Sequence, residues 1–225
     1  MLRALVFDFD GLILDTETPL IDAWAQLHER AGHAYARDDA HRLVGHVEID
    51  FDPWTAFGPA ADRAALDTAH RQLARELVAR QPVLPGVLAC LQDARARGLK
   101  LGIASNSSHR HVDGHLARLG LAAWFDSTCC REDVTAGKPA PDLYQTITRR
   151  LGVAPTEAIA FEDSSAGVLA AQRAGLWVVA VPNPSTHGHD FSAAHLVLPS
   201  LAAQPLAQLL ARFGGGHPPV GTAPA

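Results

Sequence analysis

Lysine is nearly absent from this chain, although basic residues are not. Of the 19 basic residues only Lys100 and Lys138 are lysines, and no lysine occurs between residues 16 and 82. The remaining 17 are arginines, whose planar guanidinium packs around a small anion differently from a compact ammonium. A lysine kept in such a chain is therefore a candidate for a role that arginine cannot fill. Lys138, in a Gly-Lys-Pro loop, is the candidate for binding a small anion.

Three further absences narrow the class of protein. No apolar run approaches the ~18 residues that a membrane-spanning helix needs, and Asp8 comes too early for a secretory signal peptide. The three cysteines are odd in number and two are adjacent, which favours thiols in a reducing compartment. The net charge of −5 argues against a nucleic-acid partner. We therefore expect a cytoplasmic monomer with no membrane or nucleic-acid partner.

The most informative stretch that is present covers residues 5 to 16. Apolar residues from Leu5 to Phe7 predict a buried strand, and Asp8 and Asp10 follow at its end. Two residues apart in an extended chain, the two carboxylates point to the same side. A hard cation such as Mg²⁺, which prefers oxygen ligands, would relieve their repulsion. The alternative is an ordinary Asp-Gly turn after a hydrophobic strand.

Two regions of different character follow this strand. Residues 16–82 contain no convincing strand and predict helices, the first capped by Thr16. From Pro85 onward strands and helices alternate, and the last helix is expected over residues 201–213. This alternation predicts an α/β fold with a doubly wound, Rossmann-like parallel sheet and helices on both faces. We expect an α/β core from residues 1–15 and 83–213, a small helical cap from residues 16–82 and a disordered tail from residues 214–225.

Polar side chains collect where the predicted strands end. Besides Asp8 and Asp10, one later strand ends in Ser105 and Asn106, and another in Glu162 and Asp163. The ends of the strands in a doubly wound sheet meet at one edge. Carboxylates for a cation, a hydroxyl, an amide and the Lys138 ammonium together suit a phosphate group held against Mg²⁺.

The order of these motifs resembles the haloacid dehalogenase superfamily, in the group with an inserted helical cap, and above all its β-phosphoglucomutase-like phosphatases. The resemblance extends from residue 1 to about residue 184, with the insert in the expected place. Its motifs are Asp8-Phe9-Asp10-Gly11 with Asp15-Thr16, Ser105-Asn106, Gly137-Lys138-Pro139, and Phe161-Glu162-Asp163-Ser164 with Gly167.

The resemblance implies a Mg²⁺-dependent phosphatase that acts on a small phosphomonoester, such as a sugar or nucleoside phosphate. Asp8 would attack phosphorus and carry the phosphoryl group. Asp10 would protonate the leaving oxygen and then activate water. Ser105, the Asn106 amide and Lys138 would hold the phosphoryl oxygens.

The resemblance also implies the metal ligands and the cap contacts. Mg²⁺ would be held by Asp8, the backbone carbonyl of Asp10 and Asp163, with Glu162 bound directly or through water. Asp15 and Thr16 would fix the hinge of the cap. Thr16, Gly45 and His46 are expected to contact the substrate.

Two other functions stay open. A phosphosugar mutase of the β-phosphoglucomutase type would hold a second phosphate with basic cap residues, but the stretch from His46 to Asp50, after Gly45, contains no arginine. A regulator that binds a phosphate ligand without turnover is the second alternative, and the intact set of Asp8, Asp10, Lys138 and Asp163 argues against it.

Residues outside the motifs have less specific interpretations. His111 and His115 have the spacing of a zinc-binding pair, but their charged neighbours favour a solvated helix face. The Arg-rich helix near residues 63 to 80 also carries acids, which again favours solvent exposure. Trp54 is expected either to form a wall for the substrate or to pack within the cap.

Overall fold

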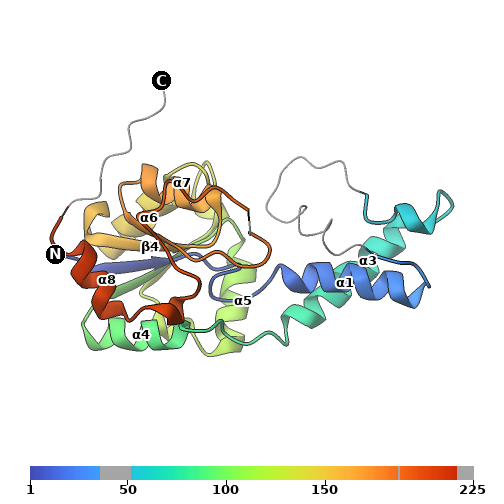
Figure 1. Cartoon of the computed structure of the whole chain (residues 1–225), viewed down its shortest axis with the longest axis horizontal. Helices are drawn as coiled ribbons and strands as arrows, with labels where there is room; N and C mark the ends of the chain where they lie inside the picture. Colours follow the sequence, from blue (N-terminus) through green and yellow to red (C-terminus); the bar gives the residue numbers. More distant parts are fainter. Residues whose placement is uncertain (36–51, 187, 217–225) are drawn as a thin grey trace, which may run out of the picture.

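A six-stranded parallel sheet forms the centre of the protein in the computed structural model, which describes residues 1–35, 52–186 and 188–216 (Figure 1). The strand order is β3-β2-β1-β4-β5-β6, and all neighbours pair in parallel. The strands are β1 (Ala4–Phe7), β2 (Lys100–Ala104), β3 (Ser127–Cys129), β4 (Ala158–Glu162), β5 (Trp177–Ala180) and β6 (Leu196–Val197). The order reverses direction between β1 and β4, which is where open α/β sheets bind ligands.

Helices cover both faces of the sheet, as predicted. Successive side chains of β1 point to opposite faces of the sheet, because side chains alternate along a strand. Leu5 and Phe7 belong to the hydrophobic cluster on one face, and Ala4 and Val6 to the cluster on the other. The first face is covered by α4 (Val87–Ala96), α5 (His109–Leu119) and α8 (Leu206–Phe213), and the second by α6 (Asp142–Leu151) and α7 (Ser165–Arg173). The predicted doubly wound fold is confirmed.

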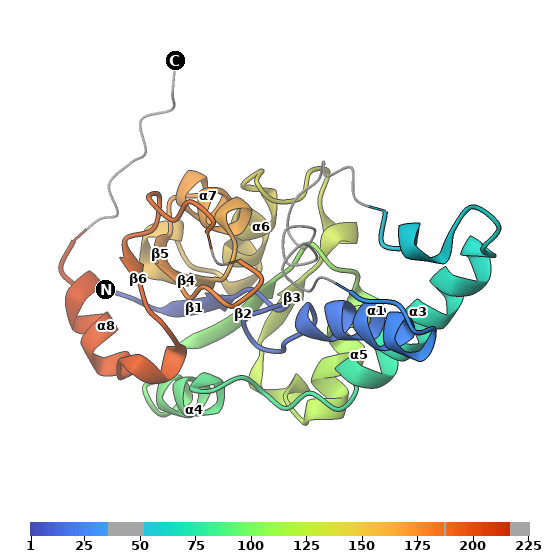
Figure 2. The same ribbon diagram turned by 45° about the vertical axis from the view of Figure 1, so that its right-hand side comes forward.

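Two helices, α1 (Thr18–Arg30) and α3 (Arg63–Val78), lie side by side beyond the edge of the sheet toward which β1 runs (Figures 1 and 2). We call α1 and α3 the cap helices. Aromatic and imidazole rings fill the space between them: Trp24 stacks on His70 with ring centroids 4.3 Å apart. Trp54 is buried and donates from Nε1 to Asp67 Oδ1 at 2.7 Å, so it packs within this unit. The chain returns to the core beside its point of departure, where Leu14 and Val83 form an antiparallel bridge.

Two predicted helix boundaries are wrong for identifiable reasons. Thr16 does not cap the first helix, which begins at Thr18. Instead Asp15 Oδ1 accepts hydrogen bonds from the backbone N–H groups of Glu17 and Thr18, and the Thr16 hydroxyl donates to Asp10. The last helix is shorter than predicted because Pro205 separates a 3₁₀ turn from α8.

Short 3₁₀ turns complete the chain at η1 (Thr55–Phe57), η2 (Ala122–Trp124), η3 (Arg131–Asp133), η4 (Pro155–Glu157) and η5 (Leu201–Ala203). Gly45, His46 and the predicted tail from residue 217 onward lie outside the described residues. The predicted boundaries of core, cap and tail stay predictions. Among the described helices, none combines the length and the apolar character that crossing a membrane requires.

Candidate active site

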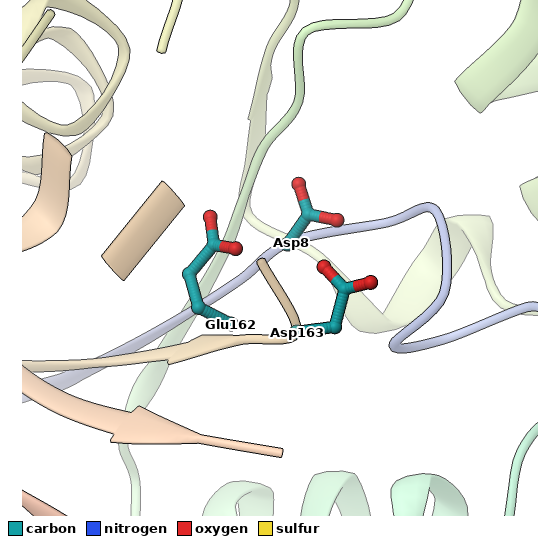
Figure 3. A group of neighbouring side chains, drawn as sticks. All are labelled: Asp8, Glu162 and Asp163. Carbon is teal, nitrogen blue, oxygen red and sulfur yellow. The ribbon is translucent and has the colours of Figure 1, made fainter. Parts of the chain in front are cut away.

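Three carboxylates meet where β1 and β4 end. Phe7 of β1 pairs in register with Phe161 of β4, so Asp8 emerges beside Glu162 and Asp163. Figure 3 shows the three side chains converging from these two strands. One oxygen from each lies within 4.8 Å of the others, and all three residues are buried. The sequence-predicted metal residues Asp8, Glu162 and Asp163 are thus brought together.

Lys138 lies against this cluster and is its cationic partner. Its side chain is only 4% exposed, and Nζ forms ion pairs with Asp8 Oδ1 and, at 2.6 Å, with Glu162 Oε1. Asn106 fixes the Lys138 backbone from both sides: Asn106 Oδ1 accepts from the Lys138 N–H at 2.8 Å, and Nδ2 donates to the Lys138 carbonyl at 3.3 Å. The side chain of Asn106 therefore orients the lysine loop.

Ionisation of all three carboxyl groups in the cluster would leave more negative charge than Lys138 neutralises. Burial raises the pKa of Asp8 to about 8, although Lys138 opposes the shift. Burial and the neighbouring charge of Asp8 also raise the pKa of Asp163 well above its usual value. Three buried carboxylates thus face one ammonium among the described residues. A divalent cation with a preference for oxygen ligands fits this donor set and would stabilise the ionised carboxylates.

Hydrogen bonds from Ser164, which is part of a predicted motif, and from two residues outside the motifs hold the acids in place. Tyr144, which is fully buried, donates its hydroxyl to Glu162 Oε1, and Ser164 donates to Glu162 Oε2 at 3.3 Å. Asn183 Nδ2 donates to Asp163 Oδ2 at 2.8 Å and to the Gly11 carbonyl at 3.2 Å. The sequence placed Tyr144 in a helix and Asn183 in a loop without indicating either contact.

Asp10 is held apart from the metal cluster by its own set of donors. Its Oδ1 accepts from the Thr16 hydroxyl at 2.8 Å and contacts His111 Nε2 at 2.8 Å. Its Oδ2 accepts from the Ser107 hydroxyl at 2.6 Å, with Ser105 Oγ 3.5 Å away. Burial would raise the pKa of Asp10, but the hydrogen bonds from His111, Ser107 and Thr16 outweigh it and hold the pKa below the usual value. That the backbone carbonyl of Asp10 binds metal stays a prediction.

The expectation that His111 lies on a solvated helix face is wrong, because its side chain contacts Asp10. It lies in the first turn of α5, and this turn follows the loop at the end of β2, so the helix brings His111 to the same edge as Ser105. The sequence did contain a signal for this contact, because His111 comes in the helical turn after a strand end that carries predicted site residues. The charged neighbours of His111 instead favoured a solvated face.

A cavity of about 1220 Å³ opens over these groups and extends to the cap helices. Its floor includes Asp8, Asp10, Ser105 and Lys138, and α3 contributes Arg71 and Arg75 to its wall. Both arginines are exposed, as expected of this helix, and they also line the cavity. No ion pair joins either arginine to a carboxylate within the described part of the chain.

Glu17 also lines the cavity, at the junction between Asp10 and the first cap helix. Burial and the nearby charges of Asp10 and Asp15 raise its pKa to about 7. Glu17 stands outside the catalytic pattern of the motif, so no feature of the sequence indicated its place in the cavity.

The chain matches a family model and individual proteins of known sequence. The family model described as haloacid dehalogenase-like hydrolase matches residues 2–175. YhcW of Bacillus subtilis is 38% identical over 214 residues, which cover 93% of this chain and 97% of YhcW. The phosphorylated carbohydrates phosphatase of Thermotoga maritima is 30% identical over 179 residues, covering 78% of this chain and 82% of that protein.

The fold is also similar to solved structures. The crystal structure of a CbbY mutant from Rhodobacter sphaeroides in complex with xylulose-(1,5)bisphosphate matches with a TM-score of 0.68 and 26% sequence identity. The match covers 90% of this chain and 96% of that one.

Proposed function

The chain belongs to the haloacid dehalogenase-like hydrolase family, and from this premise we propose that it is a Mg²⁺-dependent phosphatase of small phosphorylated metabolites, sugar phosphates first among them. The observation that carries the proposal is the contact of Lys138 with both Asp8 and Glu162 inside the buried acidic cluster. A buried lysine that orients one carboxylate and faces an open cavity suits a nucleophile beside an anion site. The similarity to a phosphatase of phosphorylated carbohydrates supports the substrate class.

In this proposal the acidic cluster holds the cation and the nucleophile together. Asp8, Glu162 and Asp163 would hold Mg²⁺, which would neutralise charge on the phosphoryl group. Lys138 favours the ionised form of Asp8 and offers donors to the phosphoryl oxygens, and Ser105 offers a hydroxyl. Asp8 attacks phosphorus, and the bond from phosphorus to the leaving oxygen breaks as the phosphoryl group moves to the Asp8 carboxylate.

Asp10 is assigned the proton transfers. It lies at the floor of the cavity, separate from the ion-paired carboxylates. It gives a proton to the leaving oxygen and then accepts one from the water that attacks the phosphoryl-aspartate. Thr16, which joins Asp10 to the chain segment entering α1, links this acid to the position of the cap helices.

Arg71 and Arg75 favour a second candidate, a phosphosugar mutase or a phosphatase of a bisphosphate. Both arginines line the cavity wall opposite the core, and an arginine binds a phosphate with paired donors. This observation restores an alternative that the acidic stretch after Gly45 had weakened. The bisphosphate bound by the structurally similar CbbY fits the same chemistry.

The test is phosphate release from a panel of sugar monophosphates, sugar bisphosphates and nucleotides, with Mg²⁺ and with EDTA. We expect release to require Mg²⁺ and to fall about 10³-fold or more in Asp8→Asn, which removes the nucleophile. Asp93→Asn, in an exposed ion pair on α4, is the matched control and should retain the wild-type rate. Release that survives Asp8→Asn would refute the proposal.

The same reactions distinguish the second candidate. Product analysis of the sugar monophosphates would show an isomer for a mutase and free phosphate for a phosphatase. Exclusive formation of the isomer would replace the leading proposal, whereas turnover of bisphosphates with phosphate release would keep it.

A further inference from the structure

The imidazole of His111 is held in one orientation against Asp10. Its Nε2 lies 2.8 Å from Asp10 Oδ1. The ring packs edge-on against Phe9, with centroids 5.8 Å apart, and against His115, with centroids 4.8 Å apart. Phe9, which stands between the two aspartates in sequence two residues after β1, is completely buried, so His111 packs against a ring that is fixed in the core.

The contact determines where the hydrogen lies. An ionised carboxylate oxygen only accepts hydrogen bonds, so Nε2 of His111 carries the hydrogen and donates it to Oδ1. Thr16 donates to the same oxygen. A ring nitrogen that donates cannot accept at the same time, whereas a hydroxyl can exchange the two roles. The partner of Oδ2 is such a hydroxyl, that of Ser107 at 2.6 Å.

The two oxygens of Asp10 are therefore not equivalent. Oδ1 is occupied by a fixed donor, while Oδ2 faces a hydroxyl that can accept a hydrogen bond from a protonated carboxyl. Ser105, which the proposed function places at the phosphoryl group, is also on the Oδ2 side, with Oγ 3.5 Å away. The oxygen free to carry a proton is therefore the one on the side of Ser105.

We propose that His111 is a positioning residue for Asp10: its Nε2–H keeps Oδ1 as an acceptor and so directs the catalytic proton to Oδ2. The proposal rests on the proposed phosphatase function. When the bond from phosphorus to the leaving oxygen breaks, the electron pair goes to that oxygen and the Oδ2 proton follows it. In the second step Oδ2 takes a proton from water, the water oxygen bonds to phosphorus, and the bond to Asp8 breaks with its electron pair returning to the carboxylate.

This role predicts a dependence on the leaving group. A sugar alkoxide is a poor leaving group and needs the proton of Asp10, whereas p-nitrophenolate leaves with little assistance. Loss of His111 should therefore slow the hydrolysis of sugar phosphates more than that of p-nitrophenyl phosphate. A structural defect would slow both reactions equally, because it lowers the amount of competent enzyme.

The experiment compares kcat and KM on p-nitrophenyl phosphate and on the best sugar phosphate of the panel. In His111→Phe, which keeps a ring beside Phe9 but has no donor, we expect kcat for the sugar phosphate to fall about 10- to 100-fold. The fall for p-nitrophenyl phosphate should be less than about 3-fold, with KM unchanged for both. His111→Gln, which keeps an N–H donor, should recover most of the lost activity.

His109→Gln is the matched control, because His109 is on the same helix but contacts Asp133 and Asp113 rather than the cavity. It should leave the ratio of the two kcat values unchanged. Equal losses on both substrates in His111→Phe, or no recovery in His111→Gln, would overturn the proposal. A wild-type protein inactive on both substrates would instead overturn the proposed function, and the role of His111 with it.

Discussion

A Cβ atom added at Gly167 would lie 2.0 Å from the carboxyl carbon of Glu162. Glu162 cannot move away easily, since it is fully buried and held by Lys138, Tyr144 and Ser164. We expect Gly167→Ala to lower the free energy of unfolding by about 1–3 kcal/mol through overpacking. Phosphatase activity should fall as well, because displacement of Glu162 disturbs Lys138.

Gly114 offers the matched comparison, since it is also a helical glycine but an added Cβ would meet nothing within 4 Å. Gly114→Ala should raise the free energy of unfolding by about 0.4–1 kcal/mol, because alanine restricts the unfolded chain. Urea denaturation of both variants measures the two effects. A neutral Gly167→Ala would show that Glu162 is free to reorient.

Single residues also show what the sequence could and could not predict about the site. The positions of Asp8, Glu162 and Asp163 were predictable because short motifs at strand ends determine them, and Lys138 was predictable from its Gly-Lys-Pro loop in a chain with only two lysines. The contact of His111 with Asp10 joins positions 101 residues apart in sequence. Such a contact depends on how α5 is oriented on the sheet, and local sequence does not determine that orientation.

At the level of secondary-structure elements, α3 carries a titratable group in its contact with α1. His70 stacks on Trp24 and contacts the Leu20 carbonyl through Nε2 at 2.9 Å. Burial lowers its pKa, and the Leu20 carbonyl and Asp67 only partly oppose this. The unfolded chain therefore binds a proton more readily than the folded chain once the pH falls below about 6.5.

We accordingly predict that the wild type loses stability relative to His70→Gln as the pH falls from about 7.5 to 5. Glutamine keeps a donor for Leu20 but does not titrate. Tryptophan fluorescence during urea unfolding at several pH values is the measurement. If the difference between the two proteins does not change with pH, His70 is not the group that titrates.

His109 of α5 supplies a control of opposite sign. Burial lowers its pKa, but hydrogen bonds and charges from Asp133 and Asp113 outweigh burial and raise it. Its contribution to stability is complete below about pH 6.5 and is lost as the pH rises through the folded-state pKa. The wild type should therefore gain stability relative to His109→Gln as the pH falls.

Elements were predicted better than their ends. The strands of the core were predicted because their apolar runs are buried on both faces, as in β1 and β4. The predicted start of α1 was wrong because Asp15 and Thr16 both suit an N-cap position. Only the fold shows that the Thr16 hydroxyl donates to Asp10 instead, while Asp15 accepts from the start of the helix. The predicted last helix was too long because it ran through Pro205, at which the structure starts a new helix.

For the molecule as a whole, cation binding at the junction of β1 and β4 should stabilise the native state. A ligand at 100 times its dissociation constant adds about 2.7 kcal/mol, which for a chain of this size raises Tm by roughly 5–10 °C. We expect Mg²⁺ to raise the Tm of the wild type and of Asp93→Asn, measured by calorimetry against EDTA.

Asp163→Asn should abolish this Mg²⁺-dependent rise while leaving the Tm in EDTA equal or higher, because it removes one of three buried carboxylates that face a single ammonium. A rise in Asp163→Asn as large as in the wild type would locate the cation elsewhere. A fall of Tm in EDTA would show instead that the contact of Asp163 with Asn183 outweighs the repulsion.

The bridge between Leu14 and Val83 has a consequence for how such proteins diversify. Because the two chain crossings to the cap helices are paired, the insert leaves and re-enters the core at neighbouring points, and joining them demands little chain entropy. The segment can then be exchanged as a cassette by recombination, while the strands and their acids keep their register. New specificities would arise by replacing the segment that carries the cap helices. A chimaera with the corresponding segment of a relative is a natural starting point for engineering.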